Sequence, residues 1–95
     1  MHNKRFDLTN QIAIVTGGAG LLGYEHAWAL VKAGSTVYLA DINEKKCIEV
    51  SKKIGKKCIP IYLDVSNEQN VKKDSRLILK KNKKVDILIN NAAIN

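Results

Sequence analysis

The residues with the clearest chemical potential form a glycine-rich stretch at residues 16–23, with the sequence Thr-Gly-Gly-Ala-Gly-Leu-Leu-Gly. An apolar run precedes it, and a helical pattern follows it as far as Gly34. Gly17 would let the chain turn sharply off a strand, Gly20 would leave room for a pyrophosphate at a helix start, and Gly23 would let that helix lie close to a sheet. The stretch is typical of a dinucleotide-binding turn, although a purely structural strand-to-helix turn has the same composition. A Walker-type phosphate loop is excluded because no Gly-Lys-Ser/Thr follows.

Acidic side chains follow the next two apolar segments of the chain. Asp41 lies 18 residues after Gly23, close to the ~20 residues expected for an acid that accepts hydrogen bonds from an adenosine ribose. A carboxylate there favours NAD over NADP because it repels the 2′-phosphate, an effect that Lys45 and Lys46 would soften. Asp41 could instead be a helix N-terminal acid that interacts with the helix dipole. Asp64 could accept from the adenine amino group or could serve as a turn residue.

Four strands alternating with three helices would position these residues. Strands are predicted over residues 11–15, 35–40, 58–63 and 85–89, and helices over residues 20–33, 43–54 and 66–81. Asn43 would cap the second helix, and Ser66 with Gln69 would form a capping box for the third. The order β-α-β-α-β-α-β indicates an α/β protein with a parallel sheet: the first half of a doubly wound, partial Rossmann fold with strand order 3-2-1-4. The glycine-rich stretch, Asp41, Asp64 and residues 90–91 would then meet at the carboxyl edge of the sheet, where open α/β sheets bind ligands.

A length of 95 residues allows one small domain at most. Its hydrophobic fraction of 45% and the lack of low-complexity segments indicate that this domain is folded. Residues 1–10 are interpreted as an N-terminal arm that Phe6 and Leu8 could attach to the body. Residues 11–95 are interpreted as an NAD(P)-binding half-domain, and the resemblance of its motifs to a known family implies that it ends before the catalytic region. The third predicted strand contains Pro60, which favours a place at the sheet edge.

The net charge of +7 arises from 16 basic and 9 acidic residues. The lysines are spread over predicted helix ends and outer faces without interleaved aromatic residues, so a solvated surface is favoured over nucleic-acid binding. No apolar run approaches the ~20 residues that cross a bilayer, and residues 1–7 lack the apolar stretch of a signal peptide, which favours a cytoplasmic protein without membrane contact. Cys47 and Cys58 lack zinc-ligand spacing and are predicted to be core residues, and His26 to have a half-buried packing role. No metal site is expected.

These motifs together resemble the N-terminal part of a short-chain dehydrogenase/reductase. The resemblance rests on the glycine-rich stretch, Asp41, Asp64-Val65 and the sequence Asp-Ile-Leu-Ile-Asn-Asn-Ala-Ala at residues 86–93, and it extends from about Leu8 to the last residue. It implies that residues 17–23 hold a pyrophosphate, Asp41 the adenine ribose, and Asp64 and Val65 the adenine, with residues 90–92 lining the adenosine side. The implied cofactor-binding residues are Thr16, Gly17, Gly18, Gly20, Leu21, Leu22, Gly23, Asp41, Asp64, Val65, Asn90, Asn91 and Ala92.

By the same resemblance, the chain is the NAD(H)-binding portion of an enzyme that transfers a hydride between a nicotinamide cofactor and a hydroxyl/carbonyl substrate. The family's Tyr-x-x-x-Lys pair, in which the tyrosine is the general acid/base, does not occur in this sequence. We therefore expect no catalysis by these 95 residues alone, and a homo-oligomer only for a full-length form. Two alternatives are a non-catalytic nucleotide-binding module and a truncated remnant. A third is a fragment of a nucleotide-sugar epimerase or dehydratase, because the spacing of Gly17, Gly20 and Gly23 resembles the extended members of the family.

Overall fold

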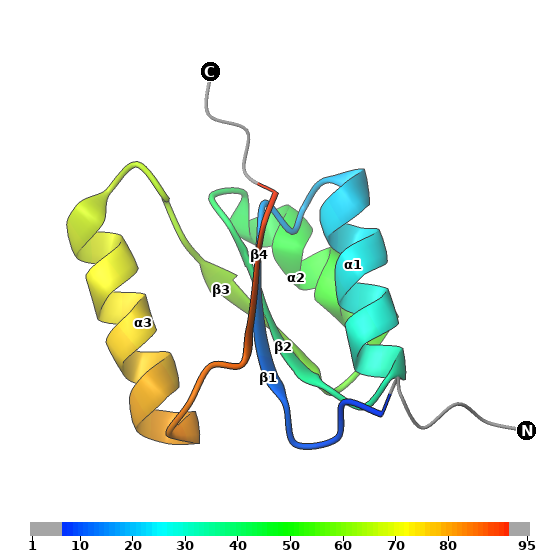
Figure 1. Ribbon diagram of the computed structural model, residues 1–95. Coiled ribbons are helices and arrows are strands. Elements are labelled where there is room, and N and C mark those ends of the chain that lie inside the picture. Colours follow the sequence, from blue (N-terminus) through cyan, green and yellow to red (C-terminus); the bar gives the residue numbers. More distant parts are fainter. Residues whose placement is uncertain (1–6, 92–95) are drawn as a thin grey trace, which may run out of the picture.

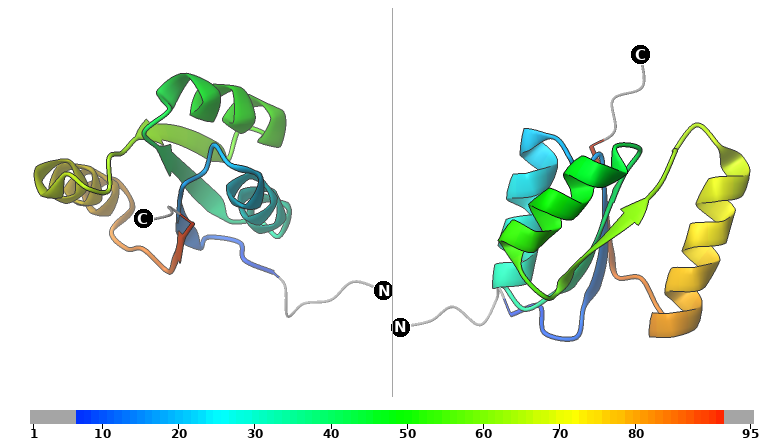
Figure 2. Two further views of the ribbon diagram at one scale, coloured as in Figure 1. Left: turned by 90° about the horizontal axis from the view of Figure 1, so that it is seen from above. Right: turned by 180° about the vertical axis from the view of Figure 1, so that it is seen from behind.

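The computed structural model describes residues 7–91, which form a four-stranded parallel sheet flanked by three helices (Figure 1). The strands are β1 (Ile12–Thr16), β2 (Thr36–Asp41), β3 (Cys58–Tyr62) and β4 (Ile87–Asn90). The helices are α1 (Leu21–Lys32), α2 (Glu44–Ile54) and α3 (Glu68–Asn82). The strand order is β3-β2-β1-β4, which confirms the predicted first half of a doubly wound fold and leaves Pro60 on an edge strand. α1 and α2 cover one face of the sheet, and α3 lies on the other (Figure 2).

The core is concentrated on the face that α1 and α2 cover. Buried side chains from the sheet and both helices meet there: Ala13, Val15, Ala27, Val37, Leu39, Cys47, Val50 and Cys58. A smaller cluster of Ile12, Tyr38 and Ile78 joins α3 to the opposite face. Both cysteines are free and buried, as the sequence predicts, and burial raises the pKa of the Cys47 thiol to about 11. This thiol is therefore protonated at neutral pH and acts as a core side chain.

α3 is less closely packed against the sheet than α1 and α2. A groove of about 410 Å³ lies between α3 and the sheet, and most of its lining is apolar. Asp74 and Ser75 line the same groove, on the side of the helix where the sequence pattern calls for apolar residues. Ile78 is the one buried residue of α3. Leu88 of β4, which also lines the groove, remains 66% exposed.

The starts of α2 and α3 show one confirmed and one wrong prediction. Asn43 caps α2, because its side-chain oxygen accepts a hydrogen bond from the Lys46 backbone N–H at 3.1 Å. The Ser66 capping box predicted for α3 is wrong. Asn67 caps that helix by accepting from the Asn70 N–H at 3.0 Å, and the hydroxyl of Ser66 donates to Asp64 instead. The shift of one residue follows because the turn before the helix uses Ser66 as a donor and leaves Asn67 as the next available acceptor.

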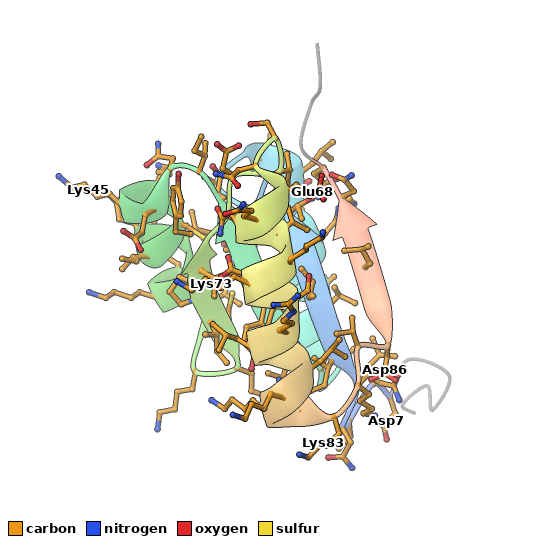
Figure 3. The ribbon with its side chains drawn as sticks, turned by 90° about the vertical axis from the view of Figure 1, so that its left-hand side faces the viewer. Asp7, Lys45, Glu68, Lys73, Lys83 and Asp86 are labelled. Atoms are coloured by element: carbon orange, nitrogen blue, oxygen red, sulfur yellow. The ribbon has the colours of Figure 1, made fainter. Side chains whose placement is uncertain are left out.

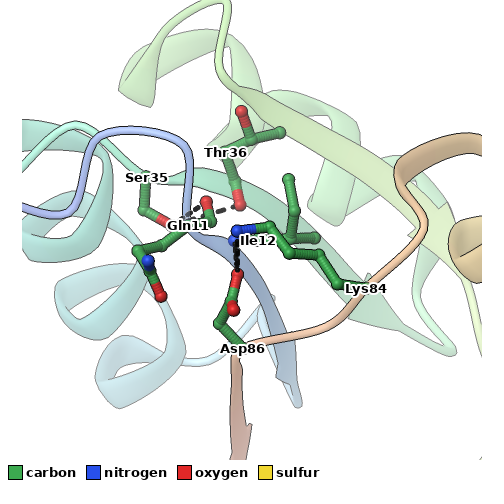
Figure 4. A network of polar contacts seen from close by, with 6 residues as sticks. All are labelled: Gln11, Ile12, Ser35, Thr36, Lys84 and Asp86. Atoms are coloured by element: carbon green, nitrogen blue, oxygen red, sulfur yellow. Dashed lines mark hydrogen bonds and ion pairs between the residues drawn. The ribbon is translucent and has the colours of Figure 1, made fainter.

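A network of polar contacts fixes the amino edge of the sheet (Figure 4). The Asp86 carboxylate accepts from the Ile12 backbone N–H at 2.8 Å and pairs with the Lys84 ammonium at 3.1 Å. The fully buried Ser35 hydroxyl donates to the Gln11 carbonyl at 3.0 Å. The Asp86 contact joins the starts of β1 and β4, and the Ser35 bond joins the start of β1 to the residue before β2, so both satisfy backbone groups at this edge.

The segment before β1 is attached to the end of α1. The Leu8 backbone N–H donates to the Ala33 carbonyl at 2.7 Å, whereas Phe6, the other predicted attachment point, lies outside the described residues. Lysine side chains project from the outer faces of α2 and α3, as Lys45 and Lys73 illustrate (Figure 3). Within residues 7–91, no helix is both long and apolar enough to cross a membrane.

Candidate functional site

The fold brings the predicted site residues together at the carboxyl edge of the sheet. The glycine-rich stretch follows β1, Asp41 is the last residue of β2, and Asn90 is the last residue of β4. The strand register aligns Thr16 with Ala40 on one side and with Asn90 on the other. Asp64 follows β3 after one intervening residue, and Ala92 lies outside the described residues. All described members of the predicted set therefore share one edge.

The fold itself requires glycine at three positions of the glycine-rich stretch. Gly17 has a φ of +67°, a left-handed conformation that favours glycine. A Cβ added at Gly23 would lie 2.5 Å from the Gly17 carbonyl oxygen, so the start of α1 approaches the turn too closely for any side chain. A Cβ added at Gly18 would overlap the buried side chain of Leu39. These three glycines place α1 directly against the end of β1.

Gly20 differs from Gly18 and Gly23 because the space beside it is open. It precedes α1 with an ordinary extended backbone, and an added Cβ would come no closer than 3.6 Å to any neighbouring atom. Among the described residues, no acceptor is paired with the backbone N–H groups of Leu21, Leu22 or Gly23 in the first turn of α1. That turn contains no acidic side chain. The positive end of the helix dipole and its open donors are thus suited to an anion.

The Asp41 carboxylate connects the glycine-rich stretch to the start of α2. One of its oxygens accepts from the Ala19 backbone N–H at 2.8 Å, and the other accepts from the Asn43 backbone N–H at 2.9 Å. The carboxylate is half-buried, and each oxygen can accept a further hydrogen bond. Asp41 therefore has a structural role and retains the capacity to bind hydroxyl groups.

Asp64 forms the turn between β3 and α3. One carboxylate oxygen accepts from the Ser66 N–H at 3.0 Å and from the Ser66 hydroxyl at 2.6 Å, while the Asp64 N–H donates to the Asn70 side chain at 2.8 Å. These bonds give Asp64 the turn role that the sequence allows. Val65 beside it is 39% exposed and lines the groove under α3.

The two asparagines after β4 are both held by hydrogen bonds. The Thr16 hydroxyl donates to the Asn90 side-chain oxygen at 2.7 Å, and the Asn91 backbone N–H donates to the Thr16 carbonyl at 3.2 Å. The side chain of Asn91 contacts the imidazole of His26 on α1, with 3.1 Å between Asn91 Nδ2 and His26 Nδ1. His26 is half-buried, as predicted, but its polar role was missed because the two residues are 65 positions apart and no local pattern links them.

Apolar side chains are exposed beside these polar groups. They follow β1, β2 and β3 in the chain, and comprise Leu21, Leu22, Ile42 and Val65. Ile42 is 60% exposed and was not singled out from the sequence, where its position directly after Asp41 was the available signal. Exposed apolar groups at an edge rich in hydrogen-bonding groups suit a ligand that has both ring and polar parts.

The family model described as short chain dehydrogenase matches residues 11–95. The chain is 36% identical over 92 residues to the peroxisomal 2,4-dienoyl-CoA reductase of Danio rerio, an alignment that covers 93% of this chain and 31% of that protein. The 3-ketoacyl-(acyl-carrier-protein) reductase of Brucella melitensis complexed with NADH matches with a TM-score of 0.79 and 30% identity, covering 85% of this chain and 33% of that one. The RhlG/NADP active-site complex of Pseudomonas aeruginosa matches with a TM-score of 0.86 and 30% identity, covering 99% of this chain and 38% of that one.

The chain thus spans about a third of the length of these proteins. The family model covers nearly all of the sequence, and the solved structures share the order of strands and helices described above. The chain belongs to the short-chain dehydrogenase family.

Proposed function

We propose that residues 11–95 bind the adenosine and pyrophosphate half of NAD(H), as the cofactor-binding portion of an oxidoreductase that interconverts a hydroxyl and a carbonyl group. One observation carries the proposal: open backbone donors at the start of α1 lie beside a glycine-rich stretch that is hydrogen-bonded to the Asp41 carboxylate. An anionic diphosphate and a neighbouring ribose are the groups that such donors and such an acceptor would bind.

Each part of the site has a role in this proposal. The N–H groups of residues 21–23 bind the pyrophosphate, for which Gly20 leaves room. Asp41 accepts hydrogen bonds from the adenine ribose, and Asp64 and Val65 contact the adenine ring. Residues 90–92 line the adenosine side, and Thr16 fixes the first two of them through its hydroxyl and carbonyl groups.

The proposed preference for NAD over NADP depends on Asp41. Its half-buried carboxylate is held in place by two backbone N–H groups, so it cannot easily swing away from a 2′-phosphate. Like charges at such close range repel. The relatives include one structure with NADH and one with NADP, so the preference rests on this residue and not on the family.

The reaction of the whole protein is part of the same proposal. The bound nicotinamide would supply or accept the hydride. A proton must move as well, and the sequence holds no Tyr-x-x-x-Lys pair that would carry it. We propose that these 95 residues bind and orient the cofactor without turning over a substrate.

A competition experiment tests the proposal. Fluorescence titration of the purified chain with NADH should give saturable binding. ADP-ribose should displace NADH because it contains the adenosine, the pyrophosphate and a ribose, whereas nicotinamide mononucleotide should not. Displacement by nicotinamide mononucleotide alone would contradict the assignment to the adenosine half. Lack of any NADH binding would contradict the proposed function.

A further inference from the structure

The contact between His26 and Asn91 joins two parts of the chain that the proposed function places on the same ligand. His26 lies in the second turn of α1, and Asn91 directly follows β4. Their side chains meet with 3.1 Å between Asn91 Nδ2 and His26 Nδ1. An amide nitrogen can only donate, so in this contact Nδ1 is the acceptor, which corresponds to the tautomer with its proton on Nε2.

This contact lies at the end of an edge strand of the sheet. Within residues 7–91, β4 pairs with β1 and with no further strand. The backbone of Asn91 is held by the Thr16 carbonyl, at 3.2 Å. The side chain of Asn91 is held as well, through its contact with His26 on α1. β4 is also short, and alternate residues along it are exposed.

The position of His26 relative to the glycine-rich stretch is set by α1, the helix on which it lies. It lies one turn after Gly23, on the same side of the helix, and Gly23 is packed against Gly17 and Gly18. The hydrogen bond that Asn91 donates to His26 therefore joins Asn91 to the helix that carries the open donors.

We propose that His26 is a positioning residue, which holds Asn91, directly after β4, at a fixed separation from the start of α1. The inference rests on the proposed function, because both parts bind the same dinucleotide there. If Asn91 and the start of α1 are already fixed relative to each other, less conformational entropy is lost when the ligand binds. His26 itself is not a cofactor contact.

Two substitutions separate this role from simple packing. In His26→Asn, the side-chain oxygen occupies the place of Nδ1, because both atoms are attached to Cγ. This variant keeps an acceptor for Asn91. His26→Leu keeps apolar volume and removes the acceptor. Leucine is also the better helix former, so a loss confined to His26→Leu cannot be attributed to a weaker helix.

The test is NADH titration of the full 95-residue chain and both variants, with thermal unfolding of each as a check on folding. We expect His26→Leu to weaken NADH binding about three- to tenfold, the range of one lost hydrogen bond, and His26→Asn to stay within about twofold of the unaltered chain. Equal affinity of all three proteins would overturn the inference alone. So would equal losses in the two variants. Failure of the unaltered chain to bind NADH would overturn the proposed function and this inference with it.

An independent measurement reads the imidazole directly. Nitrogen-15 NMR of the His26 side chain at about pH 8, where an ordinary imidazole is neutral, should report the tautomer with the proton on Nε2. A proton on Nδ1 would overturn the inference, because that nitrogen could not then accept from Asn91.

Discussion

The carboxylate of Asp41 accepts a hydrogen bond from the backbone N–H of Ala19 at 2.8 Å, which joins the end of β2 to the glycine-rich stretch after β1. The proposed ribose acceptor and the proposed pyrophosphate loop are therefore parts of one hydrogen-bonded unit. A change at Asp41 therefore alters both ligand binding and the support of the loop.

Replacing Asp41 with alanine is expected to weaken NADH binding more than NADPH binding. Hydrogen bonds to a charged group contribute about 1.5–3 kcal/mol, so the NADH dissociation constant should rise about tenfold or more. NADPH should lose less, because removal of the carboxylate also removes repulsion of the 2′-phosphate. Fluorescence titration with each cofactor measures the difference. Glu49→Ala removes the same charge from an exposed position on α2 and should change neither affinity. Equal losses for the two cofactors would show that Asp41 supports the loop without contacting the ribose.

Replacing Gly20 with alanine should reduce NADH affinity without destabilising the fold. Its backbone is extended and the space beside it is open, so a methyl group meets only the ligand. We expect at least a tenfold loss of affinity, which corresponds to roughly 1.4 kcal/mol, and a nearly unchanged melting temperature. Gly23→Ala is the matched comparison, since its Cβ would lie 2.5 Å from the Gly17 oxygen and should destabilise the chain by about 1–3 kcal/mol. Similar melting temperatures for the two variants would contradict this distinction.

Asp86 should make the stability of the chain depend on pH. The Ile12 backbone N–H, with a smaller contribution from Lys84, lowers the pKa of Asp86 below its ordinary value. The folded state therefore favours the carboxylate, and the resulting stability is present above the ordinary carboxyl pKa and lost as pH falls through the lowered one. In thermal unfolding from about pH 7 down to about pH 2, Asp86→Asn should be less stable than the unaltered chain at neutral pH, and the difference should shrink in acid. A difference that is constant across this range would contradict the expected role of the ionised carboxylate.

The purified 95-residue chain should not oxidise alcohols with NAD. Each tyrosine lacks a lysine four positions later, because Trp28, Ile42 and Ser66 occupy those positions. Without a general acid/base, cofactor binding alone leaves the hydroxyl proton in place. Following NADH absorbance with a panel of secondary alcohols measures turnover, and a rate typical of the family would prove the prediction wrong.

The strand order could be predicted from the sequence because the periodicity and the glycine, asparagine and aspartate positions all indicate the same β-α alternation. Right-handed crossovers then leave few arrangements of four parallel strands. The predicted site shares one edge for the same reason, since residues that follow parallel strands must emerge on the same side. The spacing of the glycines also predicts the sharp turn at Gly17 and the close approach of α1 at Gly23.

Other features depend on contacts between distant residues and gave no local signal. The requirement for glycine at Gly18 comes from Leu39 on the next strand, and the polar role of His26 comes from Asn91 after the last one. The start of α3 was misplaced because Ser66 and Asn67 are both good capping residues. Only the folded turn shows that the Ser66 hydroxyl donates to the Asp64 carboxylate, which leaves Asn67 to cap the helix.

The uneven packing of the two sheet faces has a consequence for the order in which the molecule opens. α3 contributes a single buried side chain, whereas β1, β2, α1 and α2 share the larger core. Amide hydrogens of α3 should therefore exchange with solvent through local opening, and those of β1 and β2 only when the whole domain unfolds. The glycine-rich stretch lies against this larger core, because Gly18 packs on the buried side chain of Leu39. The proposed pyrophosphate site would remain assembled while α3 opens and closes.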